Sequence, residues 1–341
     1  MTRLSAIVPA TNEPPSLDRC MAAIRTAEEP PEEVIVVSVA ATPGPAAARN
    51  EGAARATGEV LVFVDADVVV HPDAFQRIRR AFDAEAELAA LFGSYDDDPE
   101  DPGVVSAFRN LLHHHVHHSA PGPASTFWAG LGAIRREVFA SVGGFDARRY
   151  PHPSVEDIDL GLRLTEAGGR IRLDPGLQGQ HLKAWTLVDM LHTDFARRGV
   201  PWLELLLERG VAPTPLNLGW RHRLSAFAVL SFVASLAARR RGPATAATLA
   251  LLGLNADFYR LLLRRRGPRS AAAGVGLHAL HHLTGAAAIP VALWRLRRRR
   301  IGFPAPEHRR QGRNEAASPA GALVQDRRDD AGPDADRGRS R

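Results

Sequence analysis

The chain of 341 residues is poor in cysteine and in lysine, with one of each. Because Cys20 has no possible partner within the chain, a disulfide framework and a cysteine-based zinc cluster are both excluded. Lys183 is the single lysine, so arginine carries almost all of the positive charge. The formal net charge of +5 predicts anionic partners and gives no reason to expect a nucleic acid.

A secretory signal is also missing from the start of the sequence. The apolar run 4–10 contains Pro9 and continues directly into Thr11, Asn12 and Glu13, without a cleavage-site pattern. We therefore expect the N-terminal part of the protein to lie in the cytoplasm.

The first two hundred residues alternate short apolar runs with amphipathic stretches, which is typical of an α/β domain with a mostly parallel sheet. The pattern predicts strands at 4–8, 33–39 and 59–64 and helices at 17–27 and 46–56. Asp65, Ala66 and Asp67 follow the third strand. Ligands bind at the carboxyl ends of the strands in open α/β sheets, so we expect a site at this edge.

The composition changes near Trp220, where uncharged runs begin to alternate with arginine clusters. The 15 residues of 224–238 would be roughly 22 Å long as a helix, which is short of the ~30 Å hydrocarbon core, whereas the 24 residues of 271–294 reach roughly 36 Å. We expect 271–294 to span a membrane, and 224–238 and 243–254 to form a re-entrant or interfacial hairpin. An alanine-rich helical subdomain without a membrane is the alternative.

The end of the sequence has almost no bulky apolar residues and no period, which predicts disorder. The predicted organisation is therefore a catalytic or binding domain at 1–215, membrane-associated helices at 216–303 and a disordered tail at 304–341.

Two acidic clusters are the main candidates for chemistry. Asp65 and Asp67 follow an apolar strand and would suit a divalent cation that also holds a diphosphate, although a turn and helix cap would explain them as well. Glu156 and Asp157 precede an apolar periodic segment. A carboxylate at such a helix start can act as a general base toward a hydroxyl group, and helix capping is the alternative.

Histidines form a third group of candidates. His181 lies between Gln180 and Lys183, shortly before Trp185, and its imidazole could complete a metal shell or contact a phosphate. The run 113–118 contains five histidines, which share helix faces at i, i+4. No acidic third ligand lies at a fixed short spacing from them, so we favour packing or an acceptor contact over a dedicated metal site.

Seven segments, taken in order, resemble those of family 2 glycosyltransferases with the GT-A fold. They are Ala-Ile-Val-Pro-Ala-Thr-Asn-Glu at 6–13, Ala-Arg-Asn-Glu-Gly at 48–52, Gly-Glu-Val-Leu-Val-Phe-Val-Asp-Ala-Asp at 58–67, Phe-Trp-Ala-Gly at 127–130, Ile-Arg-Arg at 134–136, Gly-Gly-Phe-Asp at 143–146 and Glu-Asp at 156–157. The resemblance covers roughly residues 4–210. It implies a GT-A catalytic domain that transfers a sugar, with inversion and with Mn²⁺ or Mg²⁺, from a nucleotide-diphosphate donor.

The resemblance also assigns roles to individual residues. Asp157 would be the catalytic base, with Glu156 beside it, and Asp67, Asp65 and His181 would contact the metal ion. The donor would be bound by Pro9, Thr11, Asn12, Glu13, Arg49, Asn50 and Asp65, and the acceptor by Trp128, Gly130 and Trp185.

The sequence as a whole thus predicts a glycosyltransferase at the cytoplasmic face of the inner membrane, with a UDP-sugar as the default donor and a lipid-linked or polysaccharide acceptor. A sugar nucleotidyltransferase on a similar fold is the first alternative, but it would need a glycine-rich phosphate loop, which 9–15 lacks. A non-enzymatic histidine-rich metal-binding membrane protein is the second, because the chain contains 14 histidines.

Overall fold

The computed structural model describes residues 1–11, 13–40, 42–210 and 219–302. For residues 300–302 it describes the main chain alone. Residues Met1–Arg299 form one compact unit. The predicted domain boundary at residue 215, the predicted tail at 304–341 and Asn12 lie outside the described residues.

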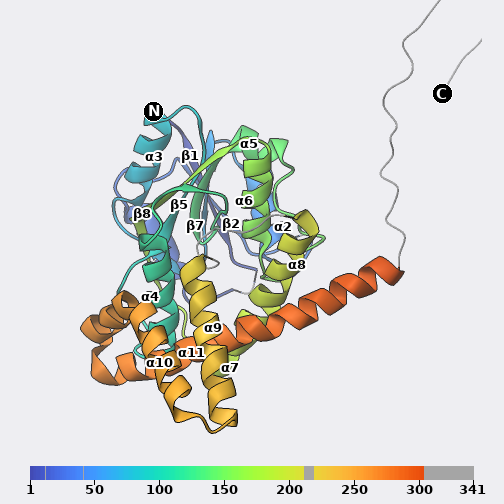
Figure 1. Ribbon diagram of the computed structural model, residues 1–341. Helices are drawn as coiled ribbons and strands as arrows, with labels where there is room; N and C mark the ends of the chain where they lie inside the picture. Colours follow the sequence, from blue (N-terminus) through green and yellow to red (C-terminus); the bar gives the residue numbers. More distant parts are fainter. Residues whose placement is uncertain (12, 41, 211–218, 303–341) are drawn as a thin grey trace, which may run out of the picture. The chain divides into compact units, whose positions relative to one another are not determined.

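An eight-stranded sheet forms the centre of this unit (Figure 1). Its strands run in the order β2-β1-β3-β7-β5-β8-β4, with β6 beside β8. The strands are β1 (Leu4–Pro9), β2 (Glu33–Val37), β3 (Val60–Val64), β4 (Val68–Val70), β5 (Leu88–Tyr95), β6 (Gly122–Ala124), β7 (Leu131–Arg135) and β8 (Arg170–His181). The three strands predicted from the sequence are β1, β2 and β3.

The sheet is mixed, in contrast to the mostly parallel sheet that we expected. Strands β1, β2 and β3 are parallel, as are β5 and β8. However, β7 lies antiparallel between β3 and β5, and β4 and β6 are both antiparallel to β8. A short antiparallel strand can follow a loop without a crossover helix, and the early βαβ pattern does not reveal it.

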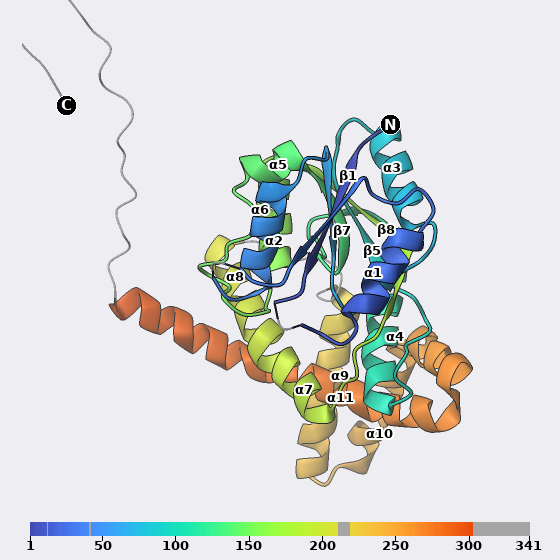
Figure 2. The same cartoon turned by 180° about the vertical axis from the view of Figure 1, so that it is seen from behind.

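Helices cover both faces of the sheet, α1, α3 and α4 on one face and α2, α5 and α6 on the other (Figures 1 and 2). They are α1 (Leu17–Thr26), α2 (Pro45–Arg55), α3 (Ala74–Ala84), α4 (Val104–His118), α5 (Arg136–Ser141) and α6 (Glu156–Glu166). After the sheet come α7 (Leu187–His192), the π-helix η1 (Thr193–Gly199), α8 (Val200–Arg209), α9 (Trp220–Ala237), α10 (Arg241–Leu254) and α11 (Ala256–Gly302).

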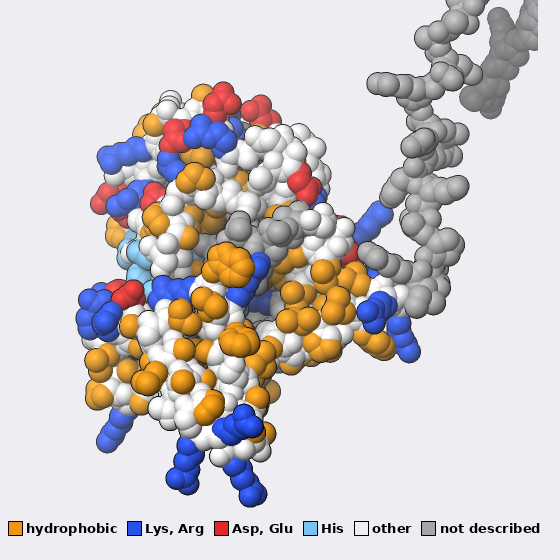
Figure 3. Space-filling model, in the orientation of Figure 1, with side chains coloured by type: hydrophobic (Ala, Val, Ile, Leu, Met, Phe, Trp, Pro, Cys, Tyr) orange, Lys and Arg blue, Asp and Glu red, His pale blue; other side chains and the backbone are white. Residues whose placement is uncertain are grey.

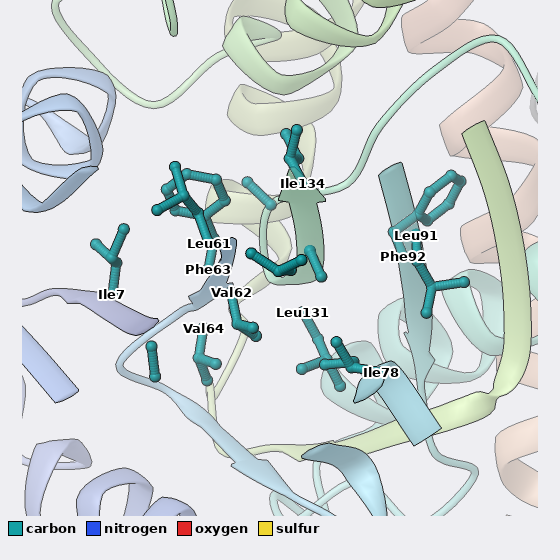
Figure 4. Close-up of a cluster of buried hydrophobic side chains, with 14 of the residues drawn as sticks. Ile7, Leu61, Val62, Phe63, Val64, Ile78, Leu91, Phe92, Leu131 and Ile134 are labelled. Carbon is teal, nitrogen blue, oxygen red and sulfur yellow. The ribbon is translucent and has the colours of Figure 1, made fainter. Parts of the chain in front are cut away.

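The main core lies between the sheet and these helices. Strand β3 is buried along its whole length, and its side chains from Leu61 to Val64 lie in the cluster shown in Figure 4. Phe63 packs edge-on against Phe127 and Phe145. Ile78 of α3 and Phe92 of β5 belong to the same buried cluster. Complete burial of β3 explains its continuous apolar sequence, and it fixes the position of the acidic residues that follow it.

Helices α9 and α10 form a hairpin in which the start of one lies beside the end of the other. Asn255, directly after α10, donates to Ser225 of α9 at 2.9 Å. Helix α11 is kinked at Gly267, whose φ is 78°, before Pro268. Its Phe258 packs against Phe108 of α4, so the C-terminal helices are joined to the sheet part by a shared apolar cluster.

Among the described residues, no single helix combines the length and the apolar character needed to cross a membrane. The pair formed by Arg241–Leu254 and Ala256–Arg299 meets that test together, with a bend of 71° between the two parts. The spanning segment predicted at 271–294 therefore stays a prediction.

Candidate active site

A cleft of about 1320 Å³ opens at the edge of the sheet where β1 and β3 end. Its walls come from the part of the chain that forms the sheet and from the helices that follow it. Pro9, Thr11, Arg49, Asp65 and Asp67 line it from the sheet side, and α8, α9 and α11 close it on the other side. The cleft therefore lies where open α/β sheets bind ligands.

Arg49 of α2 connects two of the predicted acidic residues. It lies 2.7 Å from Asp65 and 3.1 Å from Glu156, and its side chain is 6% exposed. Burial raises the pKa of Asp65, against the attraction of Arg49. Two carboxylates that share one buried guanidinium can stay charged in the interior, because the cation offsets part of their repulsion. The Arg49 bridge thus fixes the end of β3 against the start of α6.

Asp67 lies beside His181 because of the register between two strands. Val68 of β4 pairs with His181 of β8, and the main-chain nitrogen of Leu182 donates to the carbonyl oxygen of Asp67 at 2.9 Å. His181 Nε2 is 3.6 Å from Asp67 Oδ2. Burial pushes the pKa of Asp67 up, but the imidazole of His181 and the charge of Lys183 together bring it below its usual value.

The fit of these residues to a divalent cation is limited to two donors from the protein. Within the described ranges, no three His, Cys, Asp or Glu side chains are placed to hold an ion together, so the predicted set of Asp65, Asp67 and His181 is not assembled. Asp65 Oδ1 instead accepts a hydrogen bond from Arg49 at 2.7 Å. The carboxylate of Asp67 suits Mn²⁺ or Mg²⁺ when substrate phosphates supply further oxygens, and His181 adds an imidazole donor.

Asp157 lies in the first turn of α6 and also lines the cleft. Its Oδ1 accepts from the nitrogen of Ile158 at 2.8 Å, and its Oδ2 from the nitrogen of Ala129 at 3.3 Å. Burial and the neighbouring charge of Glu156 raise the pKa of Asp157 to about 6, against the attraction of Arg198 and Arg49. A carboxylate with such a pKa is ionised at neutral pH and is a stronger base than an ordinary aspartate.

Aromatic rings form one wall of the cleft. The ring of Tyr95, at the end of β5, stacks on His181 with centroids 4.1 Å apart and meets Trp128 edge-on at 4.8 Å. Gly130 allows this arrangement, because a Cβ atom there would lie 2.3 Å from the Trp128 ring. His113 of α4 lies 4.6 Å from Trp128. Such a wall offers flat faces and edges for sugar rings.

Trp185 is placed between two cations. The Arg109 guanidinium lies 4.9 Å and the Lys183 ammonium 4.2 Å from its ring centroid. Arg109 is held in turn by Asp194 of η1, at 2.6 Å, and the other oxygen of Asp194 meets His281 of α11 at 2.8 Å. This chain of contacts links the C-terminal helix to the cations of the cleft.

Some predicted residues lie elsewhere. Asn50 does not line the cleft, because its amide group is bonded in both directions to the main chain of Phe145. Glu13 and Gly130 are also absent from its lining. The histidine run lies on α4 as predicted, where His117 and His114 bond to carbonyl oxygens of β5.

The sequence did not assign a role of its own in the cleft to Tyr95, Arg109 or Asp194. Tyr95, Arg109 and Asp194 come together from β5, α4 and η1. The position of Tyr95 at the end of a strand was a usable signal, because polar groups at strand ends face the ligand edge. Arg109 and Asp194 are 85 residues apart in the sequence, and nothing in it marks them as partners.

Comparison with known proteins agrees with this geometry. Residues 39–143 match the family model of glycosyl transferase family 2. The pre-mycofactocin glycosyltransferase of Mycobacterium tuberculosis, from strains CDC 1551 / Oshkosh and ATCC 25618 / H37Rv, is 33% identical over 150 residues, which are 39% of this chain. The match spans 28% of the length of these relatives.

A solved structure extends the likeness beyond this segment. The mannosyltransferase PcManGT from Pyrobaculum calidifontis, in complex with GDP-Man and Mn²⁺, superposes with a TM-score of 0.50 at 16% identity. The alignment covers 86% of this chain and 88% of that one. At this identity the likeness concerns the fold. The chain thus has the GT-A fold, and its residues 39–143 match the model of glycosyl transferase family 2.

Proposed function

We propose that the protein is a metal-dependent, inverting glycosyltransferase that moves a sugar from a nucleotide-diphosphate donor to a hydroxyl group of an acceptor. The observation that carries this proposal is the presence of two separate carboxylate groups in one cleft. Asp67 with His181 forms a cation-binding pair, and Asp157 forms a base with a raised pKa. These are the two functions that direct glycosyl transfer requires.

The donor would lie along the ends of β1 and β3. Pro9, Thr11 and Arg49 line this part of the cleft and are assigned to the nucleoside and its phosphates. Asp67 and His181 would hold a divalent cation, which would neutralise the diphosphate as it leaves. A UDP-sugar is the default donor; the GDP-Man complex of PcManGT makes GDP-sugars the next to test.

The acceptor would approach from the side of Trp128, Asp157 and Trp185. Asp157 Oδ2 takes the proton of the acceptor hydroxyl. At the same time, the oxygen of that hydroxyl forms a bond to the anomeric carbon of the donor sugar. The bond from that carbon to the diphosphate breaks on the opposite face, and the nucleoside diphosphate leaves with the electron pair. One displacement inverts the configuration at that carbon, and no covalent intermediate with the enzyme is formed.

We further propose that transfer occurs at the cytoplasmic face of the inner membrane, to a lipid-linked or polysaccharide acceptor. Arginine clusters at 239–241, 264–266 and 295–300 alternate with apolar helical segments in the C-terminal third, and such segments bind anionic lipid surfaces. Washing membranes first with salt and then with alkaline carbonate tests this placement, with a fragment that ends near residue 219 as the comparison.

Thermal denaturation with nucleotides tests the donor site directly. UDP and GDP are each added with Mn²⁺ and with EDTA, and the proposal expects one of them to raise the melting temperature only with Mn²⁺. Asp67→Ala should lose this shift, whereas Asp73→Ala, at an exposed ion pair with Arg77, serves as the matched control. Equal shifts with Mn²⁺ and with EDTA would refute the metal assignment, and no shift with either nucleotide would refute the donor assignment.

A further inference from the structure

The cleft is larger than one nucleotide sugar requires, and its far end has a different chemical character. Typical ligand pockets measure about 300–1,000 Å³, whereas this cleft measures about 1320 Å³. At the end formed by α8, α9 and α11, its lining includes large hydrophobic side chains beside His222, Arg223, His281 and His282. We call this end the apolar bay, and it is lined by Leu203, Leu206 and Leu207 of α8, Phe227 and Leu230 of α9 and Ile289 of α11.

Four of the six side chains of the apolar bay are exposed although they are large and hydrophobic, whereas Leu206 is buried and Leu203 is partly buried. Phe227 is 69% exposed, Ile289 48%, and Leu207 and Leu230 46% each. Exposed apolar groups gathered on one concave surface are uncommon in a folded protein and mark a binding site for an apolar group. A nucleotide sugar has no apolar chain, so the proposed donor does not account for this bay.

The apolar bay continues onto an open surface. On α9, Trp220 and Leu236 lie outside the cleft and are 77% and 56% exposed. Figure 3 shows hydrophobic side chains gathered over this helical end, whereas most of the acidic side chains in view lie toward the opposite end. An apolar chain longer than the bay could therefore continue over exposed apolar side chains of α9, with the guanidinium of Arg223 beside Trp220 at one end of that helix.

A cation stands at the junction between the bay and the catalytic carboxylates. Arg198 of η1 lines the cleft and has no ion pair or hydrogen bond to any residue that the structure describes. Its charge acts on Asp157 and on Lys183, which places it among the groups of the catalytic end. An arginine without a protein partner, in a cleft, is suited to bind a phosphate group with its planar guanidinium.

The wall that carries Arg198 is fixed against the C-terminal helix. Gly199 lets α11 approach η1 closely, because a Cβ atom there would lie 3.0 Å from the Cβ of Ala288. Asp194 binds His281 of α11 on the same segment. The bay and its cation are therefore parts of one wall, formed by η1, α8 and α11.

We infer that the apolar bay is the acceptor subsite for an amphiphile, a hydrocarbon-chain lipid whose head group carries both a phosphate and the reacting hydroxyl. The chain lies in the bay, the phosphate meets Arg198, and the hydroxyl reaches Asp157. This inference rests on the proposed function and narrows its acceptor to a phosphate-bearing lipid. A polysaccharide would use neither the apolar side chains nor the free guanidinium.

Binding of simple amphiphiles to the full-length protein tests the inference without turnover. Dodecyl phosphate has both features, butyl phosphate lacks the long chain, and dodecyl maltoside lacks the charge. Each is titrated below its micelle concentration, with calorimetry as the readout. Each buried CH₂ group tightens binding by up to about fourfold, so we expect dodecyl phosphate to bind at least tenfold more tightly than butyl phosphate. We expect the same margin over dodecyl maltoside, because it has no charge to meet Arg198.

Two pairs of variants locate the site. Phe227→Asn should weaken dodecyl phosphate binding at least fivefold, whereas Leu236→Asn, on the same helix but outside the cleft, should not. Arg198→Gln should weaken dodecyl phosphate and leave dodecyl maltoside unchanged, with the exposed Arg80→Gln as its control. Equal losses in both members of a pair would show adsorption to the surface and would overturn the inference.

Two further arms separate the outcomes. Binding to anionic vesicles without binding to monomeric dodecyl phosphate would mean a membrane-docking surface and would contradict an acceptor subsite. The nucleotide shift with Mn²⁺ is measured on the same Phe227 and Arg198 variants. Amphiphile binding that is lost while the nucleotide shift is kept supports the inference. If the unmodified protein also shows no nucleotide shift in melting temperature, the donor proposal is refuted. If the protein does not bind dodecyl phosphate more tightly than butyl phosphate and dodecyl maltoside, the inference of a lipid acceptor is refuted.

Discussion

Replacing Asp157 by asparagine is expected to stabilise the folded protein at neutral pH although it removes transfer. Burial and the charge of Glu156 raise the pKa of Asp157 from its ordinary value of 3.8 to about 6, so its ionised form is disfavoured in the folded state. A shift of this size corresponds to about 3 kcal/mol, which is an upper value because Asp157 is only half-buried. Asparagine also loses one of the two bonds that the carboxylate accepts, at a cost of about 1 kcal/mol. The net expectation is a gain of about 1–2 kcal/mol.

The stability difference between Asp157→Asn and the unmodified protein should depend on pH. A carboxyl group with a raised pKa in the folded state contributes stability that is fully present below pH 3.8 and is lost as the pH rises through about 6. The advantage of Asp157→Asn over the unmodified protein should therefore grow between about pH 4 and pH 7. The groups that set this pKa are Glu156, Arg198 and Arg49.

Urea denaturation at several pH values measures this difference, and turnover is measured on the same preparations. Transfer should fall by about 10²–10⁴ in the variant while nucleotide binding persists. In the unmodified protein, the rate should fall about tenfold per pH unit below about pH 6. A variant that is less stable than the unmodified protein at every pH and keeps its rate per folded molecule would show that Asp157 is a helix-capping residue.

Other substitutions test the remaining contacts. Asp67→Ala should abolish Mn²⁺-dependent protection by nucleotide and leave the melting temperature without ligand within a few degrees, because this side chain is 30% exposed; protection that persists would contradict its role. Arg49→Met should cost about 3–5 kcal/mol in urea denaturation, because it leaves buried Glu156 without its cation; a cost below about 1 kcal/mol would refute the bridge. Gly130→Ala should displace Trp128 and cost about 1–3 kcal/mol, with a changed tryptophan fluorescence, and an unchanged spectrum would count against it.

The local pattern predicted the first half of the fold well. Strands β1 to β3 and helices α1 and α2 alternate with periods that match their secondary structure, and each lies within a few residues of its predicted range. Strand β7 was missed because its sequence, Leu-Gly-Ala-Ile-Arg, contains a glycine and only one β-branched residue, unlike the valine-rich β2 and β3. Its place between β3 and β5 depends on contacts across the sheet, which the local sequence does not contain.

The site shows the same division between local and distant information. Asp65, Asp67, Glu156 and Asp157 were predicted because they lie at the ends of strongly apolar elements. The Arg49 bridge was not, because it joins residues 107 positions apart. Asn50 was assigned to the donor, together with Arg49, by the family resemblance, but its amide group is bonded to the main chain of Phe145, as helical neighbours face different directions.

Release of nucleoside diphosphate from a panel of nucleotide sugars tests the central claim most directly. The full-length protein and Asp157→Asn are each incubated with every common UDP- and GDP-sugar, in Mn²⁺ and in EDTA, and the released nucleotide is measured. We predict that the unmodified protein releases nucleotide from one donor class in Mn²⁺ and that EDTA and Asp157→Asn each stop the release. Equal release by both proteins in Mn²⁺ and in EDTA would contradict a metal-dependent transferase with Asp157 as its base. A failure to release nucleotide from any of the donors would contradict it as well.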